Sequence, residues 1–266
     1  MPQVTMTFPM GKHKVLTLSY DDGKEADRRL LSIMNENGIK GTFHLNSGLM
    51  GVGDRIKAAE IARLYAGHEI SAHTVSHPTI ARSPREQLIE EVLEDRKKLE
   101  SLAGYTVRGI SYPNGSYNRT IKEMLPILGI SYARTVHSTG TFHMPDDFLE
   151  WNPTCHHNEN LLELADQFKR LYKKQYLYMM YVWGHSYEFD NDNNWEVIEK
   201  FCKSTGNRDD IWYATNIEIV DYIKAFHRLQ FAADTSFVYN PSVQSVWLNV
   251  DGTIKEVPGG KCVDLT

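Results

Sequence analysis

Short apolar runs alternate with longer amphipathic stretches along the first 230 residues. The short runs are typical of buried parallel strands, and the longer stretches, with apolar residues three or four apart, of helices that cover a sheet. The pattern predicts strands at 15–19, 39–45, 67–72, 107–112, 130–135, 176–183 and 211–215. It predicts helices at 25–37, 56–65, 84–102, 119–128, 161–173, 195–204 and 216–231.

The order of these elements predicts the fold class. Repeated strand–helix units imply parallel strands joined by helical crossovers, hence an α/β fold that is either an open doubly wound sheet or a closed barrel. In both architectures, functional residues gather where the strands end. Residues that carry chemistry are therefore expected at the ends of the predicted strands.

The pattern changes after residue 234. Apolar runs at 237–239 and 246–250 are followed by Asp251-Gly252 and a third run at 254–257, which is typical of a hairpin with an Asp-Gly turn. We expect residues 1–234 to form the main domain and residues 235–266 to form a short β appendage packed on it.

Composition narrows the functional classes. The net charge of -5 gives no attraction to nucleic acid or anionic lipid, and no run of about 18 apolar residues predicts a membrane span. The N-terminus lacks the basic and apolar segments of a secretory signal, so we expect a cytoplasmic location, although a trimmed chain would look the same. The three widely spaced cysteines argue against both disulfides and a thiolate metal site.

The segment Tyr20-Asp21-Asp22-Gly23 places two adjacent carboxylates at the end of the first predicted strand. An Asp-Gly pair is also common in turns, so the segment gains meaning only with partners elsewhere in the chain. Adjacent carboxylates at such a point can divide the work: one holds a cation while the other acts as a base.

Histidines at other strand ends supply those partners. His73 and His77 are four residues apart, and Pro78 disfavours a helix there, so both are expected on a strand-to-loop turn. Imidazoles together with a carboxylate suit zinc, cobalt, nickel, manganese or ferrous iron. His185 follows the later strand that ends at Trp183.

These motifs resemble the polysaccharide deacetylase family, carbohydrate esterase family four, over about residues 13–230. Ser19-Tyr20-Asp21-Asp22-Gly23 is similar to the family's Thr-Phe-Asp-Asp-Gly, and His73-Thr74-Val75-Ser76-His77 matches its His-Ser/Thr-x-x-His. Val182-Trp183-Gly184-His185 is similar to the late motif with the general acid. The resemblance implies a distorted (β/α)7 TIM-like barrel with a divalent metal, most simply zinc.

The resemblance also implies roles for individual residues. Asp21 would be the catalytic base, His185 the general acid, and Asp22, His73 and His77 the metal ligands. Charging His185 near neutral pH requires a carboxylate neighbour, for which Glu188 and Asp190 are candidates.

One family motif departs from its usual form. Where the family has Arg-x-Pro-Tyr, this chain has Ser111-Tyr112-Pro113-Asn114, so the arginine that orients the base is missing. Arg134, at the end of the next predicted strand, is our candidate replacement. We expect substrate contacts from Tyr112, Pro113, Asn114 and Trp183. The fourth motif has no clear match, although Trp151-Asn152-Pro153-Thr154 and His156-His157 stand roughly where it belongs.

Together these residues predict a metal-dependent hydrolase that removes an acetyl group from an N- or O-acetylated carbohydrate. Two alternatives remain open. One keeps the chemistry but cleaves a non-peptide C–N bond of a small amide or imide. The other is a sugar-binding relative without turnover, which the missing arginine favours and the full set of base, ligands and acid opposes.

Overall fold

A curled parallel sheet forms the centre of the molecule, which a computed structural model describes over residues 2–266. Seven of its strands run in the order β6-β5-β4-β3-β2-β8-β7, and an eighth, β9, pairs with the start of β2. The strands are β2 (Lys14–Asp21), β3 (Gly41–Leu45), β4 (Glu69–Ala72), β5 (Gly109–Ser111), β6 (Tyr132–Arg134), β7 (Cys155–His156), β8 (Tyr178–Gly184) and β9 (Ile211–Tyr213).

The segment 151–156 links the two edges of this sheet. The backbone of Trp151 bonds to Ala133 and Thr135 beside β6, whereas the N–H groups of Thr154 and His157 donate to carbonyls of β8. The chain thus continues from β6 through this segment to β8, which pairs with β2. The predicted distorted (β/α)7 barrel is confirmed, and its distortion lies where β7 is only two residues long.

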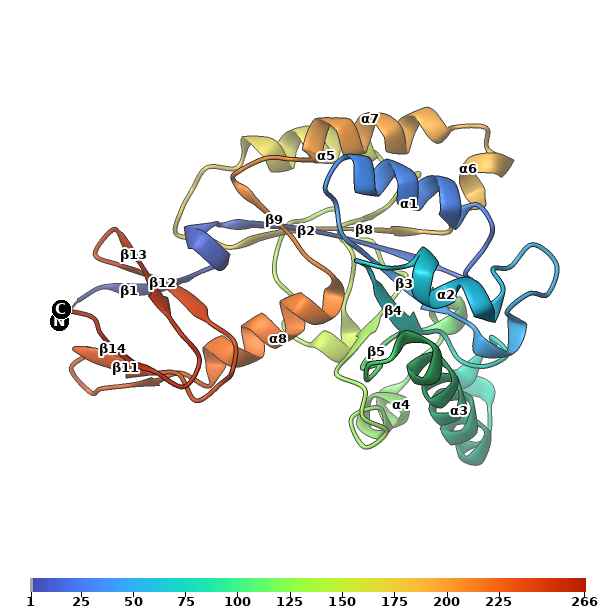
Figure 1. The fold of residues 1–266 in the computed structure, drawn as a ribbon, viewed down its shortest axis with the longest axis horizontal. Helices are drawn as coiled ribbons and strands as arrows, with labels where there is room; N and C mark the ends of the chain where they lie inside the picture. The colour runs from blue at the N-terminus through green and yellow to red at the C-terminus, as the bar shows by residue number, and fades with distance from the viewer. Residues whose placement is uncertain (1) are drawn as a thin grey trace.

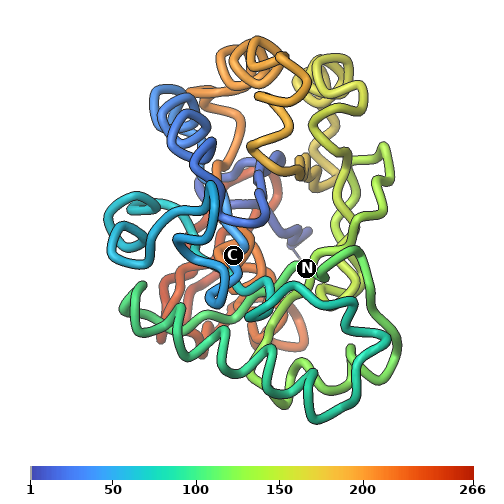
Figure 2. The backbone as a smooth tube through the Cα atoms, turned by 90° about the vertical axis from the view of Figure 1, so that its right-hand side faces the viewer, coloured from blue at the N-terminus to red at the C-terminus, as the bar shows by residue number. Residues whose placement is uncertain are grey.

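Helices cover the outside of the sheet (Figures 1 and 2). They are α1 (Asp27–Glu36), α2 (Ile61–Leu64), α3 (Arg85–Ala103), α4 (Arg119–Met124), α5 (Leu161–Arg170), α6 (Glu188–Asn191), α7 (Trp195–Thr205) and α8 (Asn216–His227). The long helix α3 ends at Gly104, whose φ of 78° is a left-handed conformation that glycine adopts without a steric penalty. The predicted helix 216–231 was too long, because α8 ends at His227 and strand β10 follows.

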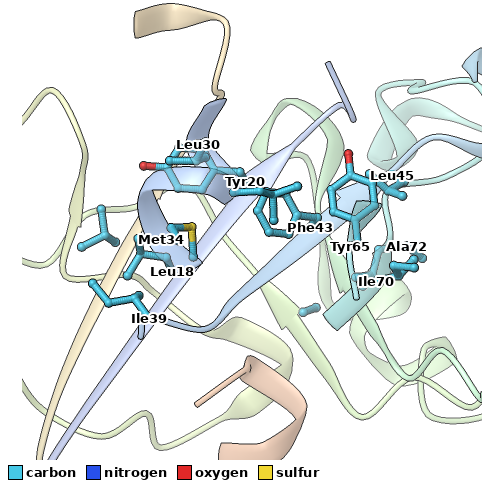
Figure 3. Close-up of a cluster of buried hydrophobic side chains, with 14 of the residues drawn as sticks. Leu18, Tyr20, Leu30, Met34, Ile39, Phe43, Leu45, Tyr65, Ile70 and Ala72 are labelled. Carbon is cyan, nitrogen blue, oxygen red and sulfur yellow. The ribbon is translucent and has the colours of Figure 1, made fainter. Parts of the chain in front are cut away.

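The main core lies between the sheet and these helices. Figure 3 shows Tyr20 and Leu18 of β2 against Met34 of α1, with Phe43 and Tyr65 continuing the same apolar layer. Every residue of β2 is buried, which fits a central strand covered on both faces. The core therefore fixes β2, and with it the position of Asp21 at its end.

Two small antiparallel sheets accompany the barrel, one with the order β1-β12-β13 and the other β10-β11-β14. Their strands are β1 (Val4–Thr7), β10 (Gln230–Phe231), β11 (Phe237–Tyr239), β12 (Val246–Val250), β13 (Thr253–Val257) and β14 (Cys262–Asp264). The hairpin β12–β13 turns at Asp251-Gly252, and β1 from the N-terminal part of the chain pairs with β12. The division of the chain into domains at residue 234 stays a prediction.

Both small sheets lie at the left of Figure 1, near the start of β2. Asp21 ends this eight-residue strand, which at roughly 3.3 Å per residue spans about 26 Å. The small sheets and Asp21 thus occupy opposite ends of the barrel. Of the helices described within residues 2–266, none has the length and apolar character needed to cross a bilayer.

Candidate metal-dependent active site

The predicted site residues converge at the end of the barrel where the parallel strands finish. Asp21 ends β2, His73 follows β4, Ser111 ends β5 and Arg134 ends β6. His185 follows β8, the other neighbour of β2 in the sheet. Residues from five strands therefore meet on one rim, as the strand-end pattern predicts.

Asp21 lies at the centre of a buried polar cluster. It is 3 % exposed, Ser111 Oγ donates to its Oδ1 over 3.1 Å, and Arg134 Nη2 pairs with its Oδ2. Burial alone would raise the pKa of Asp21, but the Arg134 guanidinium holds that pKa well below its usual range. Asp21 is therefore an ionised carboxylate that is held in one orientation.

Arg134 is itself fixed from several sides. It is fully buried, its Nη1 donates to the carbonyl of Thr135, and its guanidinium stacks 4.4 Å from the centre of the Trp183 ring. The structure thus brings Arg134 to Asp21, although the two belong to strands β6 and β2. That it orients a catalytic base stays a prediction.

Three further residues form a candidate metal centre. One ligand atom each from Asp22, His73 and His77 lies within 4.8 Å of the others. His73 Nε2 and Asp22 Oδ1 are buried, and neither has a hydrogen-bond partner among the described residues. Buried polar atoms without partners are rare, and a cation would satisfy both. The donor set of two imidazoles and a carboxylate fits a divalent metal such as zinc.

Ser111 orients the His73 ring for this purpose. The carbonyl oxygen of Ser111 lies 2.9 Å and its Oγ 2.6 Å from His73 Nδ1. Both contacts favour a proton on Nδ1, which leaves the Nε2 lone pair facing Asp22 and His77. Burial lowers the pKa of His73, so its ring is neutral, as metal binding requires. Sequence reasoning noted Ser111 only as the residue in place of the family's arginine.

The backbone around the ligands adopts an uncommon conformation. Asp22, Thr74 and His77 have φ values of 79°, 67° and 61°, in the left-handed region. This conformation is an outlier for a β-branched residue such as Thr74, and it persists only where surrounding contacts impose it. Here Asn46 Nδ2 donates to the carbonyls of His73 and Thr74, and Asp95 accepts from the His73 N–H. Neither Asn46 nor Asp95 was singled out from the sequence.

His185 has the carboxylate partner that a charged imidazole needs. Glu188 Oε1 lies 3.1 Å from His185 Nδ1, and Glu188 Oε2 accepts from the His185 N–H. Burial works against a charged ring, but the bond to Glu188 and the charge of Asp21 outweigh it and raise the pKa of His185. Asp190, the other candidate, instead accepts from the Trp195 indole.

The predicted substrate contacts differ in accessibility. Asn114 is exposed and has a φ of 55°, whereas Pro113 is buried. Tyr112 is 1 % exposed, and its hydroxyl donates to the Leu149 carbonyl, so this side chain is occupied within the fold. Trp183 is 9 % exposed and packs beneath Arg134. Of these four side chains, that of Asn114 is the one open to solvent.

The sequence of this chain is similar to those of known polysaccharide deacetylases. The polysaccharide deacetylase family model matches residues 10–133, which include Asp21, Asp22, His73, His77 and Ser111. The resemblance to the polysaccharide deacetylase family is confirmed. A peptidoglycan-N-acetylglucosamine deacetylase of Bacillus cereus is 30 % identical over 112 residues, or 40 % of this chain and 38 % of that protein. Chitin deacetylase 1 of Cryptococcus neoformans is 26 % identical over 140 residues, or 51 % and 28 % of the two chains.

Solved structures support the barrel fold. Puue allantoinase superposes with a TM-score of 0.65 at 15 % identity, over 83 % of this chain and 93 % of that one. A family 4 acetyl xylan esterase from Clostridium thermocellum, solved with a cobalt ion, gives 0.52 at 17 % identity, over 78 % and 90 %. The chain spans well under half the length of the two curated relatives that it matches.

Proposed function

We propose that this protein is a metal-dependent deacetylase that hydrolyses an acetyl group from an N- or O-acetylated carbohydrate. The observation that carries the proposal is the pairing of an ionised, immobilised Asp21 with the convergent Asp22, His73 and His77. The relatives named as deacetylases of chitin and peptidoglycan support the acetylated-sugar class. Zinc is the proposed metal, and a cytoplasmic location without nucleic-acid or membrane partners stays a prediction.

A divalent cation held by Asp22, His73 and His77 would polarise the acyl carbonyl and make water more acidic. Asp21 accepts the proton of the attacking water, because its carboxylate is ionised and held by Ser111 and Arg134. The backbone near Asn114 is the proposed donor to the developing oxyanion.

His185 completes the reaction in this proposal. The oxygen of water joins the acyl carbon, the C–N or C–O bond to the sugar breaks, and the leaving atom needs a proton. With a pKa raised by Glu188, His185 carries that proton near neutral pH. Acid and base thus differ in environment: Asp21 lies beside a guanidinium and His185 beside a carboxylate.

The change Asp21→Asn tests the proposal. It should leave the three metal ligands in place but lower turnover by about 10²–10⁴, the usual effect of losing a general base. Acetate release from acetylated saccharides and xylosides measures turnover, and elemental analysis measures bound metal. The exposed Asp209→Asn is the matched control. Full turnover in Asp21→Asn would remove Asp21 from the role of base.

A second candidate function is hydrolysis of a small amide or imide. The replacement of the family's Arg-x-Pro-Tyr by Ser111-Tyr112-Pro113-Asn114 favours it, because this loop borders the site. Small linear and cyclic amides in the same substrate panel separate the two candidates. Product from amides without acetate from saccharides would support the second. Metal binding together with sugar binding but no hydrolysis would support a non-catalytic relative.

A further inference from the structure

A second group of potential metal ligands lies beside His185. His156 ends β7, His157 begins the turn that follows, and Glu188 begins α6. One ligand atom from each lies within 4.8 Å of the others. The Nε2 atoms of His156 and His157 lie 3.1 and 3.2 Å from Glu188 Oε2. Two ligand atoms on a tetrahedral zinc ion, each roughly 2.0–2.1 Å from it, are about 3.3 Å apart, so the group already has nearly that spacing.

His157 is the member that points most clearly to a ligand. Its side chain is 0 % exposed, yet neither ring nitrogen has a hydrogen-bond partner among residues 2–266. The approach to Glu188 is close but does not have the geometry of a hydrogen bond. A neutral imidazole has one N–H donor and one lone pair, and each polar atom left without a partner in the interior costs about 1–3 kcal/mol. A cation at Nε2 would use that nitrogen and fix the proton on Nδ1.

The surroundings hold the His157 ring in this orientation. It stacks between Phe189, at 4.1 Å between ring centres and 26°, and Tyr20, at 5.7 Å and 17°. Its Nδ1 faces the backbone of Gly184, where an added Cβ would lie only 2.1 Å away. The ring therefore presents Nε2 to Glu188. Glycine at 184 is what permits this close approach.

The proton position on the His156 ring weakens cation binding at this group of ligands. The N–H of Asn158 donates to His156 Nδ1 over 3.2 Å, which places the ring proton on Nε2, the atom that faces Glu188. A cation at Nε2 must displace this proton and disrupt the bond from Asn158. His73 needs no such change, because its Nδ1 already faces the Ser111 carbonyl. Binding at His156 should thus be weaker than at His73, because the ring proton must first move from Nε2 to Nδ1.

We propose that His156, His157 and Glu188 form a second, weaker site for a divalent cation of the zinc type. Glu188 cannot serve a cation and His185 equally, because its two oxygens now contact His185 Nδ1, the His185 N–H and both other histidines. Occupancy of the second site therefore withdraws the carboxylate partner of His185. Excess metal should inhibit the enzyme, a consequence that rests on the function proposed above; the binding itself does not.

Metal titration of the full chain tests the site. Protein stripped with a chelator is titrated with cobalt(II), and bound metal is measured by equilibrium dialysis and by visible absorption of the ion. We expect two equivalents, the second about tenfold weaker than the first. His156→Ala should remove the weaker equivalent and keep the stronger, whereas His73→Ala should do the reverse. His227→Ala, an exposed histidine on α8, should keep both.

Glu188→Gln provides an independent check, because it removes the negative charge of the carboxylate with little change in size. It too should lose the weaker equivalent. A single equivalent in the wild-type protein at a hundredfold excess over the first dissociation constant would overturn the proposal. So would a second equivalent that survives both His156→Ala and Glu188→Gln. These are binding measurements, so a protein that binds two cations but hydrolyses nothing would refute the proposed function and keep this site.

Discussion

Replacing Arg134 with methionine removes one half of a buried ion pair. Arg134 is 0 % and Asp21 3 % exposed, so in Arg134→Met the carboxylate stays in the interior without its main countercharge. Breaking such a pair from one side usually costs about 3–5 kcal/mol of unfolding free energy. Ser111 Oγ still donates to Asp21, which favours the lower end, about 3 kcal/mol.

The loss of unfolding free energy in Arg134→Met should depend on pH. In the wild-type protein the folded-state pKa of Asp21 is below its unfolded value, so its ionised form stabilises the fold above the unfolded pKa. That contribution disappears as pH falls through the folded pKa. In Arg134→Met the pKa of Asp21 rises, because burial remains and the guanidinium is gone. The stability difference between the two proteins is therefore largest at neutral pH and shrinks in acid.

Urea unfolding of metal-free protein, followed by tryptophan fluorescence, measures this difference. The double variant Asp21→Asn/Arg134→Met completes a double-mutant cycle. The Arg134 change should lower the free energy of unfolding by less when residue 21 carries no charge. Arg119→Met is the matched control, because Arg119 is exposed and should show no measurable change. A cost below about 1 kcal/mol, or an equal cost with and without the Asp21 carboxylate, would refute the reasoning.

Three further changes test the rest of the site. His73→Ala should abolish metal binding at the Asp22 site; elemental analysis that finds this metal retained would remove His73 from the ligand set. Glu188→Gln should move the alkaline limit of kcat to lower pH, because burial lowers the pKa of His185 and only the more distant charges of Asp21 and Asp22 then oppose it; an unmoved limit in the pH–rate profile would count against His185 as the acid. Ser111→Ala should weaken metal affinity by about tenfold, the lower end for a residue that orients a ligand, because the Ser111 carbonyl still faces His73; unchanged affinity in a cobalt titration would show that Oγ plays no part.

The barrel, and the functional groups at its rim, could be predicted from the sequence. Apolar runs marked the strands because both faces of a strand such as β2 are buried, and polar residues at their ends marked the site. Strands β7 and β10 could not be predicted, because each is two residues long and too short to show a hydrophobic periodicity. The helix predicted to 231 failed for the same reason, since nothing in its apolar pattern changes at His227.

Side-chain contacts between strands that are distant in the sequence also could not be predicted. Arg134 could be named only as a candidate, because sequence order does not say which side chain on β6 reaches the end of β2. Glu188 and Asp190 were equal candidates for His185, and the turn into α6 decides between them. The supports of the ligand loop, Asn46 and Asp95, carry no motif, because their hydrogen bonds go to backbone atoms.

The placement of the small sheets has a practical consequence for work on insoluble substrates. β1 and β14, the first and last strands, lie at the left of Figure 1, a full strand length from Asp21. A resin, an affinity tag or a fused binding module joined to either terminus would attach on that side. The rim that carries Asp21 would then face outward, so immobilised protein should retain its access to a solid polymer.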